Sequence, residues 1–129
     1  MENKTKKTRI LIVEDDKAYQ EALKFALINE GFEVFTADKG ESALNLTKNT
    51  NFDLILLDIL MPGMDGIEFS YQMKKIVKKE IPIIILSNLT KAVYPADVKD
   101  YLIKANTSLE EIVAKVKEYL NTDYNLVPV

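Results

Sequence analysis

Acidic side chains follow two apolar runs of this sequence at the points where the runs end. Glu14, Asp15 and Asp16 come directly after a run of Ile, Leu and Val, and Asp58 comes directly after a run of Leu and Ile. Carboxylate oxygens are the ligands that hard cations such as Mg²⁺ prefer in proteins. Neighbouring carboxylates that lack a cation repel one another. The pattern therefore indicates a magnesium site, provided that the fold brings these residues together.

A hydroxyl group and a lysine follow two further apolar runs. Ser87 and Asn88 come after residues 81–86, and Lys104 comes after the short run at residues 101–103. An acidic residue at the start of a loop is commonly only a helix cap or a solvated turn. Several polar residues at the ends of successive apolar runs are better explained by one shared site, in which Lys104 supplies positive charge.

The composition excludes several other kinds of chemistry. The 129 residues include no cysteine and no histidine, which rules out disulfides, thiol nucleophiles, zinc fingers and Ser–His–Asp catalysis. The net charge of −3 argues against binding to nucleic acid. Because no apolar run approaches ~20 residues, we expect no membrane span and a cytoplasmic protein.

The apolar runs predict strands, and periodic patterns between them predict helices. Short runs rich in Ile, Leu and Val are typical of strands buried on both faces, and they cover residues 10–13, 33–37, 54–57, 81–86 and 101–103. Apolar residues at helical spacing lie after Asp16, at 42–48, at 66–77 and after Ser108. The alternation predicts an α/β domain with a parallel sheet, whose site lies at the carboxyl ends of the strands.

Three local signals mark the ends of these helices. Asp16 is a plausible N-cap, and Gly31 stands where a left-handed glycine ends a helix. Ser108 and Glu111 have the spacing of a capping box.

The same residues carry a resemblance to a known family. These residues are the acidic residues after the first run, the segment DILMPGMDG at residues 58–66, the run ending at Ser87 and the segment DYLIK at 100–104. They resemble the receiver domain of a two-component response regulator, here of the single-domain type. The resemblance implies a flavodoxin-like, doubly wound sheet of five parallel strands in the order 2-1-3-4-5. It implies a receiver domain over residues 9–120, between a basic tail at 1–8 and a C-terminal tail at 121–129.

The resemblance also implies roles for site residues. Asp58 matches the aspartate that accepts a phosphoryl group, and the Mg²⁺ ligands would be Glu14, Asp15, Asp58 and the carbonyl of Leu60. We prefer Glu14 and Asp15 to Asp15 and Asp16 as the acidic pair, because Asp16 better serves as a helix cap.

Three further residues complete the implied machinery. Ser87 and Lys104 match the hydroxyl and the lysine that contact the phosphoryl group, and Tyr101 matches an aromatic that moves inward on activation. The ordinary alternative for Tyr101 is a surface tyrosine on a short strand. The implied partners are a sensor histidine kinase or phosphotransfer protein and a downstream protein target, with a monomer or weak homodimer and neither nucleic acid nor membrane involved.

The sequence departs from the family pattern at three places. Ala105 stands where a cis proline commonly follows the lysine, so we expect either a trans loop or a strained cis bond. The span between Ser87 and Tyr101 is short, which predicts a fourth helix reduced to a turn or two near residues 95–99. Leu60 and Leu89 flank the phosphoryl position and cannot orient water, so we expect slow autodephosphorylation.

Two other functions remain open. A receiver-like interaction module that has lost phosphorylation would account for Ala105 and the short span. A small Mg²⁺ phosphohydrolase would need a second aspartate two residues after the first, where this chain has Leu60. We therefore expect no enzyme activity beyond self-phosphorylation and autodephosphorylation.

Overall fold

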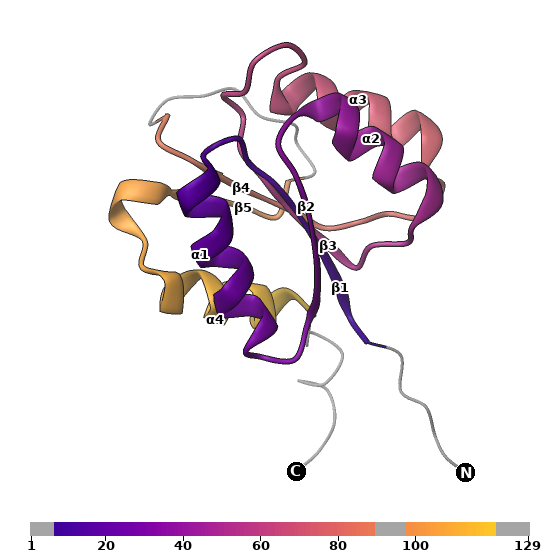
Figure 1. Cartoon of the computed structure of the whole chain (residues 1–129). Helices are drawn as coiled ribbons and strands as arrows, with labels where there is room; N and C mark the ends of the chain where they lie inside the picture. Colours follow the sequence, from indigo (N-terminus) through magenta and orange to yellow (C-terminus); the bar gives the residue numbers. More distant parts are fainter. Residues whose placement is uncertain (1–6, 90–97, 121–129) are drawn as a thin grey trace, which may run out of the picture.

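The computed structural model describes residues 7–89 and 98–120 (Figure 1). Strands and helices alternate along the chain, in an order that ends with two successive strands and a helix. The elements are β1 (Arg9–Val13), α1 (Lys17–Ile28), β2 (Glu33–Ala37), α2 (Gly40–Asn49), β3 (Leu54–Leu57), α3 (Gly66–Ile76), β4 (Ile83–Ser87), β5 (Asp100–Ile103), the short 3₁₀ helix η1 (Lys104–Asn106) and α4 (Leu109–Leu120).

The five strands form one parallel sheet in the order β2-β1-β3-β4-β5. This confirms the predicted doubly wound, flavodoxin-like α/β fold. Strand order reverses between β1 and β3, where successive crossovers leave the sheet toward opposite faces. Polar groups that follow β1 and β3 therefore lie at the crevice where such sheets bind ligands.

Helices cover both faces of the sheet. In Figure 1, α1 and α4 lie on one face, and α2 and α3 lie on the other. Apolar side chains of β1, β3 and β4 point alternately into two buried clusters, one under each helix pair. This explains why the central strands are continuous apolar runs rather than alternating ones.

The predicted helix ends are confirmed. The Asp16 carboxylate accepts the backbone N–H of Tyr19 at 3.2 Å, and Gly31 has a φ of 96° after α1. Ser108 and Glu111 exchange hydrogen bonds of 3.1 and 2.8 Å, which is a capping box.

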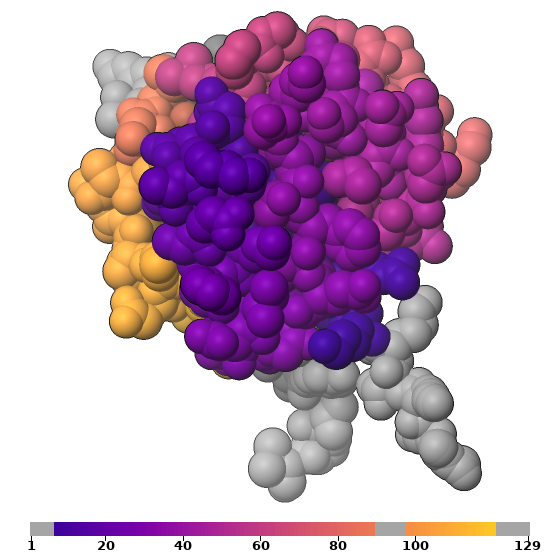
Figure 2. Space-filling model, viewed as in Figure 1, coloured from indigo at the N-terminus to yellow at the C-terminus, as the bar shows by residue number. Residues whose placement is uncertain are grey.

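The edge strand β2 lies between α1 and α2 in the sequence, and the side chains of these three elements form one continuous surface in Figure 2.

A few predicted boundaries differ from the structure. Helix α2 is longer than the predicted 42–48, and β4 begins at Ile83 and runs on to Ser87 rather than covering 81–86. A short helix was also predicted near residues 95–99, between β4 and β5. Residues 95–97 lie outside the described residues, and residues 98 and 99 are not helical. The tail at 121–129 and residues 1–6 of the basic tail also lie outside them.

Candidate phosphoryl-acceptor site

Three carboxylates meet where β1 and β3 end. Val13 and Leu57 are register partners in neighbouring parallel strands, so the residues that follow them, Glu14 and Asp58, emerge side by side. The Asp58 N–H donates to the Val13 carbonyl at 3.0 Å, which extends the backbone hydrogen bonds between β1 and β3 by one residue. Glu14, Asp15 and Asp58 can each place one carboxylate oxygen within 4.8 Å of the others.

The members of this cluster differ in their exposure to solvent. Glu14 is 3% exposed and Asp58 is 6% exposed, whereas Asp15 is exposed at the rim. Glu14 is held from two sides, because its Oε2 accepts the Asp16 N–H at 2.9 Å and its carbonyl accepts the Gln20 side-chain amide at 2.8 Å. Asp16 itself caps α1. The geometry thus groups Glu14 with Asp15 and Asp58, while the choice of Glu14 and Asp15 as the acidic pair stays a prediction.

Lys104 brings a positive charge into contact with two of these carboxylates. Its Nζ lies 2.5 Å from Glu14 Oε1 and 3.1 Å from Asp58 Oδ2, and its side chain is 12% exposed. The same ammonium lies 4.8 Å from the centroid of the Tyr19 ring, a cation–π contact. Lys104 follows β5 at the sheet edge, so its long side chain reaches back across the end of β4.

Burial and charge oppose one another in this cluster. Burial raises the pKa of Glu14, and the hydrogen bond from Lys104 offsets only part of that rise. Burial disfavours the Lys104 ammonium, but the hydrogen bond to Glu14 and the charge of Asp58 outweigh it, so the pKa of Lys104 is raised. The lysine is therefore firmly charged at neutral pH.

The donor set suits a divalent cation. Three carboxylates meet one lysine, which leaves an excess of negative charge among oxygen donors. Mg²⁺ prefers such oxygens and keeps several waters, which the exposed rim at Asp15 allows. Leu60 lies two residues after Asp58, and its backbone N–H donates to Asp58 Oδ1 at 3.2 Å while its side chain is 57% exposed.

Ser87 and Tyr101 are linked through one short segment. Ser87 ends β4 and is fully buried, and its Oγ accepts the Leu89 N–H at 3.4 Å. The Tyr101 hydroxyl donates to the Leu89 carbonyl at 2.7 Å, and its ring packs partly buried against the core. The Tyr101 side chain is thus tied to the loop that Ser87 begins.

The segment after Lys104 has a trans backbone. The Lys104–Ala105 peptide is trans and opens η1, so the strained cis alternative does not occur. The Ala105 N–H donates to Asn88 Oδ1 at 2.9 Å. The sequence pattern predicts no role in the site for Asn88 or for Tyr19. The position of Asn88 directly after Ser87 was the only signal that pointed to the first of them.

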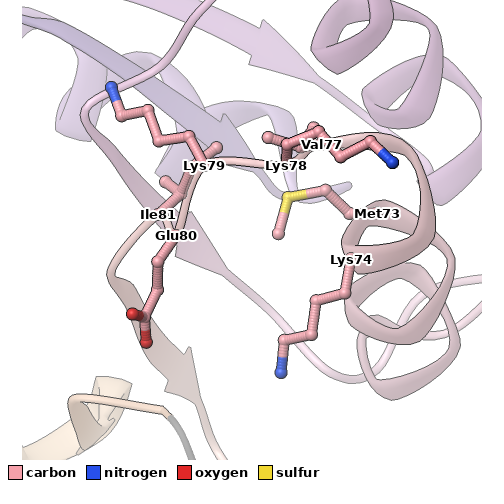
Figure 3. Close-up of a pocket in the computed structure, with 7 residues that line it drawn as sticks. All are labelled: Met73, Lys74, Val77, Lys78, Lys79, Glu80 and Ile81. Carbon is pink, nitrogen blue, oxygen red and sulfur yellow. The ribbon is translucent and has the colours of Figure 1, made fainter.

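A separate hollow lies at the other end of the sheet. It has a volume of about 210 Å³ and lies where α3 ends and β4 begins, with Met73 and Ile81 in its wall. Figure 3 shows the lysines around it with their ammonium groups directed away from the Met73 sulfur. It contains none of the predicted site residues.

No helix within residues 7–89 and 98–120 has both the length and the apolar character needed to cross a bilayer.

Known proteins share both this sequence pattern and this fold. Residues 10–117 match the family model of the response regulator receiver domain. Transcriptional regulatory protein ResD of Bacillus subtilis (strain 168) is 35% identical over 123 residues, which are 92% of this chain and 50% of ResD. The chain therefore spans about half the length of that relative.

Two solved structures illustrate the likeness in fold. A CheY-like response regulator receiver domain protein from Methanospirillum hungatei JF-1 superposes with a TM-score of 0.84 at 29% identity, covering 93% of this chain and 98% of that one. Response regulator protein TrrA from Thermotoga maritima, solved in complex with Mg²⁺-BeF, gives 0.76 at 35% identity, covering 86% and 97%. This chain belongs to the response regulator receiver domain family of two-component systems.

Proposed function

We propose that the chain accepts a phosphoryl group on Asp58 in a two-component phosphorelay, and that this switches its contacts with other proteins. The observation that carries the proposal is the position of Asp58, a buried carboxylate that lies with Glu14 and Asp15 and 3.1 Å from the Lys104 ammonium. A carboxylate nucleophile, a divalent-cation donor set and a lysine are what transfer of an anionic group to an anionic acceptor requires.

Glu14, Asp15, Asp58 and the Leu60 carbonyl would hold Mg²⁺. When bound, the ion neutralises the carboxylates and the phosphoryl oxygens, so that an anionic donor can approach. The Leu60 N–H, which donates to Asp58 Oδ1, helps to fix the orientation of the acceptor carboxylate.

In the transfer step, an oxygen of Asp58 forms a bond to phosphorus as the phosphorus–nitrogen bond of the donor's phosphohistidine breaks. The electron pair of the broken bond stays on the imidazole nitrogen, which takes up a proton. These 129 residues contain no histidine, and we infer that the donor is a histidine kinase or a phosphotransfer protein. Lys104, whose ammonium lies 3.1 Å from Asp58 Oδ2, would share the negative charge of the transferred group.

The switch would run from Ser87 to Tyr101. A phosphoryl oxygen on Asp58 is a strong acceptor for the Ser87 hydroxyl, and its capture draws the loop after β4 toward the site. Because the Tyr101 hydroxyl donates to Leu89 in that loop, the Tyr101 side chain moves with it. The outer surface near β5 then presents a different shape to a protein target.

A second candidate is a receiver-like interaction module that works without phosphorylation. One observation favours it, namely that Lys104 already contacts both Glu14 and Asp58 and so balances part of the cluster's charge. In that case the module would bind its partner equally well with or without a phosphodonor.

Intact-mass spectrometry distinguishes the two candidates. The chain is incubated with acetyl phosphate and Mg²⁺, and we expect one phosphoryl group on the wild type and none on Asp58→Ala. Asp53→Ala, which changes an aspartate just before β3 at the other end of the sheet, is the matched control and should still gain one group. A wild type that gains no mass would support the module.

A further inference from the structure

One hydrogen bond joins the two loops that carry Ser87 and Lys104. Asn88 Oδ1 accepts the Ala105 N–H at 2.9 Å, between residues that are 17 positions apart in the chain. Asn88 follows β4 directly, and Ala105 is the second residue after β5. Both residues are exposed, so water competes for this bond and the bond can open without disturbing the core.

The bond acts on the peptide group that follows Lys104. The Ala105 N–H belongs to the same planar unit as the Lys104 carbonyl, so holding the N–H fixes the orientation of that plane. The direction of the Lys104 side chain depends on this backbone, because Lys104 must span from the end of β5 to Glu14 and Asp58. Small displacements of a positioning group cost rate in reactions that depend on placement.

Another contact of this peptide plane comes from within the turn itself. The Thr107 N–H donates to the Lys104 carbonyl at 3.4 Å, a long bond with its ends in the same turn. The Thr107 hydroxyl donates to the Ile103 carbonyl at 2.8 Å and also stays within it. Asn88 is thus a side chain outside the turn that holds the backbone of the turn, whereas Glu14 and Asp58 contact only the Lys104 ammonium.

We propose that Asn88 is a positioning residue that holds Lys104 for phosphoryl transfer and couples its position to the Ser87 loop. This rests on the proposed function of Asp58. Leu89, the next residue, accepts the Tyr101 hydroxyl, so one short segment after β4 holds both β5 and the Lys104 turn. When Ser87 moves toward a phosphoryl group, Asn88 carries that movement to the lysine that shares its charge.

The first test measures the bond itself in the unphosphorylated protein. Amide hydrogen exchange of Ala105 should be faster in Asn88→Ala than in the wild type, because its N–H loses its acceptor. Asn106→Ala is the matched control, since Asn106 is exposed in the same turn. Equal exchange at Ala105 in wild type and Asn88→Ala would overturn the proposal.

The second test measures the rate of phosphorylation by acetyl phosphate with Mg²⁺. Loss of one hydrogen bond that positions the lysine should slow Asn88→Ala by about fivefold, while Asn106→Ala keeps the wild-type rate. If Asn88 acts through Lys104, then Asn88→Ala should have no further effect in a Lys104→Met background. A general weakening of the fold would instead slow both backgrounds equally.

The outcomes separate this inference from the proposed function. The role of Asn88 alone is overturned if the wild type is phosphorylated and Asn88→Ala is phosphorylated at the same rate. It is also overturned if Asn88→Ala slows phosphorylation equally in the wild-type and the Lys104→Met backgrounds. A wild type that takes up no phosphoryl group overturns the proposed function and the role of Asn88 with it.

Discussion

At the residue scale, the Lys104 ammonium is the positive charge that contacts the two buried carboxylates of the site. It contacts Glu14 and Asp58, which are both almost fully buried, and its own pKa is raised because their attraction outweighs its burial. Removing one partner of a buried ion pair leaves an uncompensated charge, which costs more than the pair itself contributes.

Replacing Lys104 should therefore destabilise the protein in a way that depends on pH. We expect Lys104→Met to lower the free energy of unfolding by roughly 2–3 kcal/mol at neutral pH. The pKa of Glu14 is already raised from its usual 4.5, and loss of the lysine raises it further. A carboxyl group whose pKa is higher in the folded than in the unfolded chain favours the folded state at low pH, and this contribution is lost as pH rises. The loss of stability in Lys104→Met, relative to the wild type, should therefore shrink as pH falls toward 4.5.

Urea titrations from neutral to mildly acidic pH measure this dependence. Lys115→Met is the control, because Lys115 lies 3.3 Å from Asp100 at the surface and should change stability little. A deficit of Lys104→Met that grows on acidification would contradict the account.

Leu60 and Leu89 bear on the lifetime of the phosphorylated form. The Leu60 side chain is 57% exposed beside Asp58, and Leu89 packs partly against the core. Neither side chain can orient an attacking water, so phosphate release should be slow, with a half-life well beyond seconds. Leu60→Gln supplies a polar group at an exposed position and should shorten the half-life several-fold without changing the fold. Release within seconds from the wild type would refute this prediction.

At the element scale, the start of α3 packs directly on the segment that contains Asp58. The Gly66 N–H donates to the Ile59 carbonyl at 3.0 Å, and a Cβ at Gly66 would lie 2.5 Å from the Asp58 carbonyl oxygen and 2.8 Å from the Ile59 Cα. Both neighbours are backbone atoms, so a side chain at Gly66 must displace either α3 or the acceptor loop.

Gly66→Ala should thus cost about 2 kcal/mol of stability or more, even though alanine is the better helix former. Gly40→Ala is the matched control at the first residue of α2, where the added methyl meets the Met64 side chain rather than backbone. We expect the control to lose clearly less, as measured by thermal unfolding. An equal loss in both variants would show that the close approach at Gly66 is not what limits this position.

The elements themselves could largely be predicted because their signals are local. The N-cap at Asp16, the glycine at 31 and the capping box at 108–111 depend on neighbouring residues, and all three occur as predicted. Boundaries were less predictable, as at α2, where Gly40 and Glu41 join the helix although they break its apolar pattern.

At the scale of the whole molecule, the parallel sheet gathers site residues from distant parts of the sequence. Because parallel strands end at one edge, the polar residues after β1, β3, β4 and β5 could be predicted to converge. The contacts that refine the site could not be predicted, because they depend on loop backbones. The Asn88 side chain meets the Ala105 N–H, and the Tyr19 ring meets Lys104, through conformations that no local pattern encodes.

If the carboxylates at this edge hold Mg²⁺ as proposed, the stability of the whole fold should depend on the ion. At a concentration roughly a hundred times the dissociation constant, the ion should raise the free energy of unfolding by about 2.7 kcal/mol. Asp15→Asn removes one of the proposed ligands and should abolish most of this gain. Asp16→Asn keeps a good N-cap beside the cluster and should retain it. Equal responses of the two variants to Mg²⁺ in thermal unfolding would contradict the assignment of the acidic pair.

The central claim is that Asp58 is the residue that accepts the phosphoryl group, and borohydride trapping tests it most directly. Borohydride reduces a phosphorylated aspartate to homoserine, which peptide mass spectrometry then locates in the chain. After incubation with acetyl phosphate and Mg²⁺, we predict homoserine at position 58 and at no other aspartate. Homoserine at another position, or at none while the intact protein carries phosphate, would contradict the account.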